Sequence, residues 1–119
     1  MEHNIRIRKI GAQSDVALIK LRGFLDTIAA YDLQEKGDEL IEEGIYKHII
    51  DCEHLEYISS AGIETFYNMV QKLQKNHGEV IFTHVPDKIY NLFNLIGTTT
   101  FFQIKDTIRE ATKEFESHE

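Results

Sequence analysis

The apolar residues of this chain switch repeatedly between the spacing of a β-strand and the spacing of a helix. Alternation over residues 5–10 and an apolar run over residues 16–21, separated by turn-prone residues 11–15, predict two strands joined as a hairpin. Helical spacing then begins at Thr27 and ends near Gly44. A strand hairpin followed by a helix of this length is typical of an α/β fold rather than an all-β or all-α fold.

The same alternation continues to the end of the chain. Further strands are predicted over residues 48–52, 79–85 and 101–104, and further helices over residues 61–76, 86–97 and 107–116. Strands that alternate with helices of ten or more residues imply parallel crossovers, whereas the opening hairpin is antiparallel. The sequence therefore predicts an α/β fold built on a mixed sheet of about five strands and about four helices.

Length and charge limit the possible partners. A chain of 119 residues with 42% hydrophobic content fits one domain, residues 1–119, with a real core. The formal charge is −7, and the longest cluster that contains Lys and Arg is residues 6–9, where they alternate with the isoleucines of a strand. Because nucleic-acid binding needs a basic surface, we expect no nucleic-acid partner.

The sequence also predicts where the protein works. Cys52 is the only cysteine, so no intrachain disulfide can form and a reducing compartment fits best. Met1 is followed by polar residues 2–4 rather than by an apolar signal region, and no run approaches the roughly 20 apolar residues that span a bilayer. We therefore expect a cytoplasmic protein without a membrane partner.

Neither a metal site nor a cofactor site is predicted. The six histidines are scattered, and no pair has the three- or four-residue helical spacing that would direct two imidazoles to one metal. They are interpreted as surface histidines or as core histidines with hydrogen-bond partners. The glycines at 11, 23, 37 and 44 stand alone, so no glycine-rich phosphate loop is present.

Catalytic constellations are incomplete. The serines at 59 and 60 lack the Gly-x-Ser-x-Gly elbow of a hydrolase, and His54 is the nearest imidazole in sequence. A phosphate-receiver domain would use Asp51 and Lys105, but it also needs an acidic pair after the first strand, where this chain has residues 11–12, Gly-Ala. We interpret Asp51 instead as a strand-end residue that bonds nearby backbone N–H groups. The chain is predicted not to be an enzyme.

The most informative segment is residues 49–63, in which a buried strand ends in acids and leads to Ser59 and Ser60 at a helix start. Unpaired N–H groups at a helix N-terminus favour negative charge, so a phosphate would be well tolerated there. The alternative is that these serines only cap the helix. Both interpretations stay open at this point.

Residues 23–27 and 51–63 together resemble the two signature regions of the anti-sigma-factor antagonist family, the STAS domain. The resemblance continues through residues 85–97 and 101–111, so it covers nearly the whole chain. It implies a single mixed sheet with helices packed mainly on one side. It also implies that a partner kinase phosphorylates a serine at the start of the second helix.

In such a family member, the unphosphorylated form binds that serine kinase, which is an anti-sigma factor, and so frees a sigma factor or another target. Phosphate blocks the binding, and a PP2C-type serine phosphatase resets the switch. An added charge of about −1.5 to −2 would break an interface built for a hydroxyl, and Glu53, Glu56 and Glu64 would add repulsion. One alternative is a STAS interaction module that serves a partner-switching or scaffold pathway without a sigma factor and is not phosphorylated. A weaker one is small-molecule or nucleotide binding at the same surface.

The resemblance assigns the site residues with one departure. The commonest family pattern places the acceptor directly before glycine, where this chain has Ala61. Other members have Asp-Ser-Ala-Gly, onto which the acceptor maps at Ser60, with Ser59 as the second choice. Asp26 matches the family's loop acid, but it could equally be a helix cap. Tyr57 and Ile63 could contact a partner or lie in the core. The predicted partner-binding residues are Leu25, Asp26, Tyr57, Ser59, Gly62 and Ile63.

Overall fold

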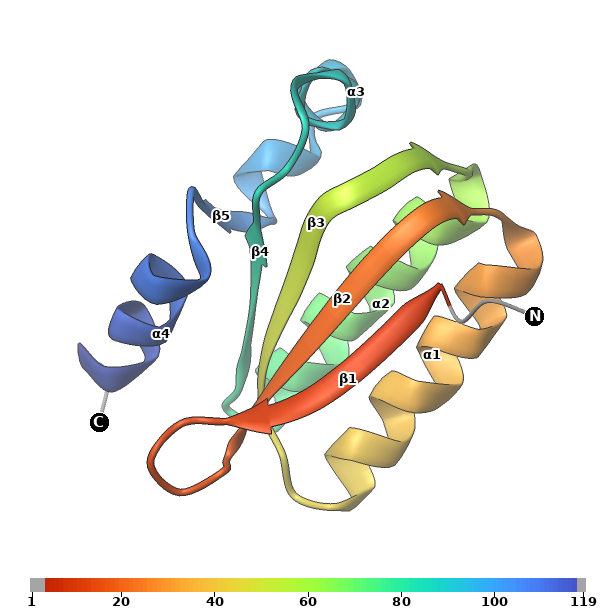
Figure 1. The fold of residues 1–119 in the computed structure, drawn as a ribbon. Coiled ribbons are helices and arrows are strands. Elements are labelled where there is room, and N and C mark those ends of the chain that lie inside the picture. The colour runs from red at the N-terminus through yellow and green to blue at the C-terminus, as the bar shows by residue number, and fades with distance from the viewer. Residues whose placement is uncertain (1–3, 118–119) are drawn as a thin grey trace.

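A computed structural model of the protein describes residues 4–117 and shows one five-stranded sheet flanked by helices (Figure 1). The strands are β1 (Ile5–Ile10), β2 (Val16–Leu25), β3 (Lys47–Ile58), β4 (Glu79–Thr83) and β5 (Gln103–Lys105). The helices are α1 (Thr27–Glu42), α2 (Ser60–Lys75), α3 (Asp87–Leu95) and α4 (Ile108–Ser117), with a short 3-10 turn, η1 (Thr98–Thr100).

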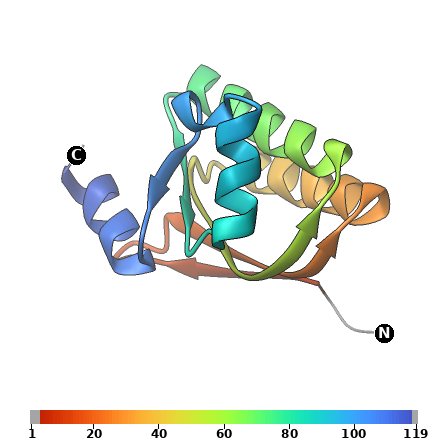
Figure 2. The same ribbon diagram turned by 90° about the horizontal axis from the view of Figure 1, so that it is seen from above.

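The sheet order is β1-β2-β3-β4-β5, with β1 antiparallel to β2 and all other pairs parallel. The predicted mixed sheet is therefore confirmed. Parallel crossovers are right-handed as a rule, so strands added in one direction place successive helices on the same face. Helices α1, α2 and α3 lie together on that face (Figure 2). The terminal helix α4 follows the last crossover and packs against β3, β4 and β5 from the other side.

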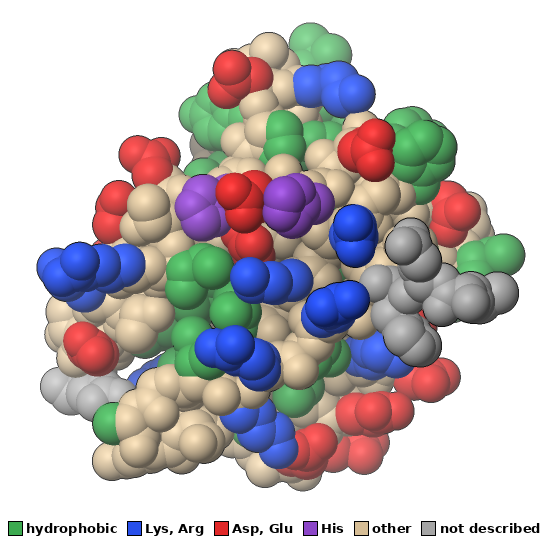
Figure 3. Space-filling view, in the orientation of Figure 1, with side chains coloured by type: hydrophobic (Ala, Val, Ile, Leu, Met, Phe, Trp, Pro, Cys, Tyr) green, Lys and Arg blue, Asp and Glu red, His purple; other side chains and the backbone are tan. Residues whose placement is uncertain are grey.

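The two faces of the sheet bury different amounts of apolar surface. The helices α1 to α3 cover the main core, where the ring of Phe66 lies 4.8 Å from Phe82 and 6.2 Å from Phe102, measured between centroids. Helix α4 covers only a small second cluster, which includes Ile49 and Phe115. The rest of that face is open, and Lys and Arg side chains gather on it over β1 and β2 (Figure 3). They are Arg6, Arg8, Lys20 and Arg22.

Strand β3 is longer than predicted, and the reason is irregular pairing. Two register shifts with β2, between Lys20 and Arg22 and between Gly23 and Phe24, interrupt the alternation on which the prediction depended. Asp51 therefore lies inside the strand with 2% of its surface exposed. The interpretation of Asp51 as a strand-end residue that bonds backbone N–H groups was wrong.

The last strand also differs from its prediction. It covers residues 103–105 rather than 101–104. Phe102 enters the main core from the turn before the strand, whereas Phe101 is 58% exposed and its ring packs edge-on against Tyr67. The two adjacent aromatic residues were predicted to begin a strand. Instead, the buried side chain of Phe102 fixes the turn that precedes the strand.

Burial shifts the pKa of two side chains on β3. Desolvation lowers the pKa of His48, and a hydrogen bond between its Nε2 and the carbonyl oxygen of Ile45, 2.9 Å long, partly opposes that effect. Desolvation also raises the pKa of the Cys52 thiol, and the nearby charge of Asp51 raises it further. Both shifts favour the uncharged form of the side chain, and Cys52 lies in the main core. Within residues 4–117, no helix is long and apolar enough to cross a membrane.

Candidate functional site

The starts of α1 and α2 are held together at one edge of the sheet. Because β2 and β3 are parallel neighbours, their carboxyl ends meet and both helices begin there. The backbone N–H of Ser59 donates to the carbonyl oxygen of Leu25 over 2.9 Å, and the Ser59 hydroxyl donates to the same oxygen over 2.9 Å. These two bonds fix the end of β3 against the end of β2.

Ser59 and Asp26 both cap helices. The Ser59 Oγ atom accepts a hydrogen bond from the Gly62 N–H at 3.1 Å, at the start of α2. The Asp26 Oδ1 atom accepts one from the Ala29 N–H at 3.0 Å, at the start of α1. Each cap satisfies an N–H group that the first turn would otherwise leave unpaired. The Ser59 hydroxyl thus has both a donor and an acceptor role within the fold.

Ser60 is placed differently from its neighbour. It is the first residue of α2, it is exposed, and its hydroxyl makes no hydrogen bond to any residue from 4 to 117. The positive end of the helix dipole lies beside it, which suits an anionic group. Of the two serines, Ser60 is the one whose hydroxyl can be modified without removing a bond of the fold.

Gly62 allows the close approach of α2 to β2. A Cβ atom at this position would lie 2.7 Å from Ile58 Cγ1, 2.9 Å from Leu25 Cδ2 and 3.1 Å from the Leu25 carbonyl oxygen. Leu25 itself is 2% exposed, so its side chain lies in the core and its carbonyl is its contribution to the site. Ile63 is partly buried against the main core. Among the predicted partner-binding residues, Leu25, Gly62 and Ile63 therefore shape the site mainly from beneath its surface.

Exposed apolar side chains lie at the ends of β2 and β3 and on the first turns of α1. Tyr57 is 50% exposed, and its ring centroid lies 5.7 Å from that of Phe24, which is 58% exposed. Ile28 and Tyr31 project from the first turns of α1 with 81% and 74% of their surface exposed. A hollow of about 230 Å³ lies between α1 and α2. Its lining includes Thr27, Tyr31 and Gln34 from α1 and Ala61, Glu64 and Asn68 from α2.

Acidic groups border this apolar surface. Asp26, Glu56 and Glu64 are all exposed, and Glu64 lies one helical turn after Ser60. Glu53 was expected to contribute as well, but it lies farther back on β3, where one of its carboxylate oxygens is grouped with Asp51 and His84. The charge close to Ser60 is therefore negative without Glu53.

Three exposed residues at this end of the molecule were missed from the sequence: Phe24, Ile28 and Tyr31. The sequence spacing on α1 could have identified Ile28 and Tyr31. The buried residues of that helix form one stripe, made of Ala30, Leu33, Gly37 and Leu40. Ile28 and Tyr31 fall outside that stripe and must face solvent or a partner. Phe24 gave no such signal, because the register shift beside it reverses the expected alternation.

Comparison with known proteins gives a consistent result. The family model described as STAS domain matches residues 8–111. The anti-sigma-B factor antagonist of Staphylococcus aureus is 24% identical over 88 residues, which cover 74% of this chain and 82% of that protein.

Solved structures show the same fold. The NMR structure of TM1081 from Thermotoga maritima has a TM-score of 0.83 at 21% identity, covering 96% of this chain and 90% of that one. The anti-sigma factor antagonist SpoIIAA in its unphosphorylated form has a TM-score of 0.76 at 18% identity, covering 95% and 97%. The phosphorylated form of SpoIIAA from Bacillus gives 0.74 at 20% identity, covering 93% and 98%.

Proposed function

Because this chain belongs to the STAS domain family, we propose that it is an anti-sigma-factor antagonist that works by regulated protein–protein binding. In this proposal the unphosphorylated protein binds an anti-sigma factor that is also a serine kinase. Phosphorylation of Ser60 then ends the binding, and a PP2C-type serine phosphatase restores it. Its relatives are binding proteins rather than enzymes, and the proposed site contains no catalytic constellation.

The observation that carries the proposal is the free hydroxyl of Ser60 within an exposed apolar surface. Phe24, Ile28, Tyr31 and Tyr57 offer the aromatic and aliphatic side chains that are enriched in protein interfaces. Solvent exposure of such residues near the unbonded hydroxyl of Ser60 supports a docking surface that carries its own modification site.

Charge explains how phosphate would control the docking. A phosphoserine adds about −1.5 to −2 charges. The N-terminus of α2 accommodates that charge, so the fold is retained. A partner docked over an apolar surface would have to bury it, next to Asp26 and Glu64, which are also negative. Binding is therefore lost although the protein remains folded.

A second candidate function is a STAS interaction module that is not phosphorylated and does not serve a sigma factor. Ala61 favours it, since this residue occupies the position directly before Gly62 and has no hydroxyl. In that case the same surface would remain in its binding state permanently.

The test uses the cognate kinase with ATP, followed by mass-spectrometric mapping of the modified residue. The proposal expects phosphate on Ser60 and none on the Ser60→Ala variant. Phosphate on Ser59 would move the acceptor, and no phosphate with a kinase proven to bind would favour the second candidate.

Binding is measured separately by calorimetry with the same kinase. Ser60→Asp should weaken binding by at least tenfold without lowering the midpoint of unfolding. Gln71→Glu is the matched control, because it adds one negative charge to an exposed position three turns farther along α2. Equal binding by the two variants would contradict the assignment of Ser60 to the interface.

A further inference from the structure

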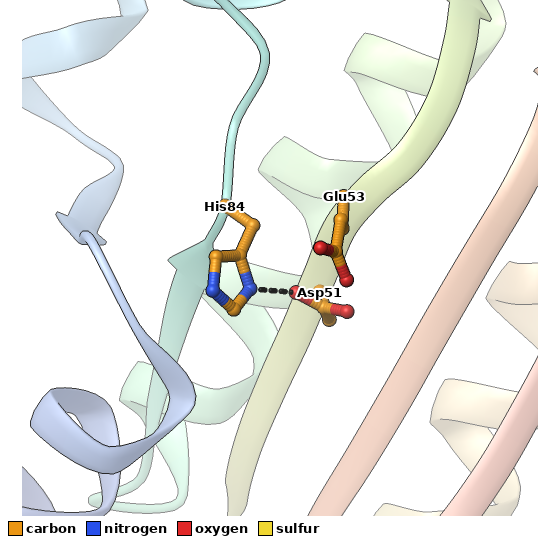
Figure 4. Close-up of side chains that lie close together, drawn as sticks. All are labelled: Asp51, Glu53 and His84. Carbon is orange, nitrogen blue, oxygen red and sulfur yellow. Dashed lines mark hydrogen bonds and ion pairs between the residues drawn. The ribbon is translucent and has the colours of Figure 1, made fainter.

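A cluster of three metal-ligating side chains lies on the sheet face opposite α1 to α3. We call Asp51, Glu53 and His84 the β3–β4 cluster (Figure 4). One ligand atom from each residue lies within 4.8 Å of the other two. The shortest separation, 2.7 Å, joins Asp51 Oδ1 and His84 Nδ1. This cluster has no part in the function proposed above.

The backbone brings these residues together from distant positions in the sequence. Asp51 and Glu53 lie two residues apart on β3, and their side chains are on the same side of the strand (Figure 4). Thr83, the register partner of Asp51 on β4, donates its hydroxyl to Asp51 Oδ1 over 3.0 Å. His84 follows directly with a φ of 49°, and its ring points from the end of β4 toward Asp51 on β3. A positive φ is uncommon for residues other than glycine, although histidine adopts it more often than most.

Burial makes the Asp51 carboxylate dependent on a positive partner. Its side chain is 3% exposed, and an ionised carboxylate at that depth is destabilised unless a cation or strong donors compensate it. Glu53 adds a second carboxylate, whereas the half-buried imidazole of His84 can add at most one positive charge. A divalent cation bound between the three side chains would compensate both carboxylates.

The donor set identifies the class of cation. One imidazole nitrogen with two carboxylate oxygens suits Zn²⁺, which binds such groups at about 2.0–2.2 Å. A hard ion such as Mg²⁺ prefers oxygen ligands alone. No thiolate takes part, because Cys52 points into the main core on the opposite face. We propose that the β3–β4 cluster is a Zn²⁺ site, with Asp51, Glu53 and His84 as its protein ligands and the remaining coordination open to water.

The geometry requires only small movements. Tetrahedral bonds of about 2.1 Å place ligand atoms about 3.4 Å apart. Asp51 Oδ1 and His84 Nδ1, now 2.7 Å apart, must therefore separate slightly, and the Glu53 carboxylate, within 4.8 Å of both, must approach by up to about 1.4 Å. The Glu53 side chain is 55% exposed, and its Oε1 atom lies 3.6 Å from the Nε2 atom of the exposed His54, a contact that it would give up on binding the ion. Lys20 opposes the site, because it is the register partner of Asp51 on β2 and brings a like charge to the same face.

The experiment uses the full chain without an affinity tag, freed of metal with a chelator and then titrated with ZnCl₂ in a calorimeter. We expect one Zn²⁺ per chain and a midpoint of unfolding that rises with Zn²⁺ concentration, because the ligands converge only in the folded state. Co²⁺ substituted for Zn²⁺ should give visible absorption bands. Lys20→Gln should strengthen Zn²⁺ binding.

Two variants locate the ion. His84→Asn should weaken Zn²⁺ binding at least tenfold. His77→Asn is its matched control, since His77 also has a positive φ, of 61°, and lies exposed outside the cluster. Asparagine tolerates this backbone conformation at both positions. Glu53→Gln should also weaken Zn²⁺ binding, and because Glu53 is exposed, this variant is expected to fold normally. Absence of Zn²⁺ binding, or equal binding by His84→Asn and His77→Asn, would overturn the proposal.

Discussion

Strand β3 contributes to two polar regions that are built in opposite ways. At its end, the Ser59 backbone and hydroxyl are bonded to main-chain groups near the surface, and the adjacent Ser60 hydroxyl is left exposed. In its middle, Asp51 is buried and depends on the side chains of Thr83 and His84. One region is positioned by the backbone and the other by side chains.

The two regions tolerate different kinds of change. At the start of α2, charge can be added to an exposed hydroxyl without removing a hydrogen bond, so modification alters the surface alone. At Asp51, the loss of a hydrogen-bond donor leaves a buried carboxylate without a partner and therefore lowers the free energy of unfolding. The arrangement at the start of α2 favours a switch on the surface, whereas the arrangement around Asp51 favours a site for a bound cation.

The largest effect is expected where the backbone approach at α2 is blocked. Gly62→Ala places a methyl group 3.1 Å from the Leu25 carbonyl oxygen, which cannot move because it accepts both bonds from Ser59. We expect a loss of about 3 kcal/mol in the free energy of unfolding, measured by urea denaturation. Phosphorylation of Ser60 should also slow, since the start of α2 would be displaced.

Gly37 provides the control for this substitution. It lies inside α1, and a Cβ atom there would meet only the flexible end of Met69, at 3.0 Å. Gly37→Ala should raise the free energy of unfolding by up to about 1 kcal/mol, because alanine has the higher helix propensity. The strain of moving the Met69 side chain would reduce that gain. Similar losses for the two glycines would show that the close approach at Gly62 does not position the site.

The next largest effect is expected at the buried carboxylate of Asp51. Thr83→Val keeps the shape of the side chain but removes the hydroxyl that donates to Asp51 over 3.0 Å. Hydrogen bonds to charged groups contribute about 1.5–3 kcal/mol, so we expect a loss of about 2 kcal/mol in urea denaturation.

Thr65 is the matched residue in the other region. Its hydroxyl is also buried, and it donates to the carbonyl oxygen of Ala30 over 3.3 Å, joining α2 to α1. Because both partners are neutral and the bond is long, Thr65→Val should cost only about 0.5–1 kcal/mol. If the two threonine variants lost the same stability, Asp51 would not depend on charged hydrogen bonds as described.

The sequence predicted the order of strands and helices because each apolar run is locally periodic. It also placed Ser59 and Ser60 at a helix start, since cap residues and the following apolar stripe are local signals. The extension of β3 was not predictable in this way, because its register shifts arise from pairing with β2. The contact between Asp51 and His84 was missed for a related reason. It depends on which strands become neighbours and on the left-handed conformation of His84, and neither is encoded by local spacing.

The smallest effect separates the two adjacent serines. Ser59→Ala removes a cap and a bond to Leu25, so we expect a loss of about 1 kcal/mol in urea denaturation. Ser60→Ala removes no hydrogen bond within residues 4–117 and introduces a better helix former, so stability should change by less than about 0.5 kcal/mol. Kinase labelling should show the reverse order, with phosphate retained on Ser59→Ala and lost on Ser60→Ala. If the same serine controlled both stability and labelling, the structural and regulatory roles would not be divided between Ser59 and Ser60. The phosphate would then replace a hydrogen bond of the fold rather than add a charge to a free hydroxyl.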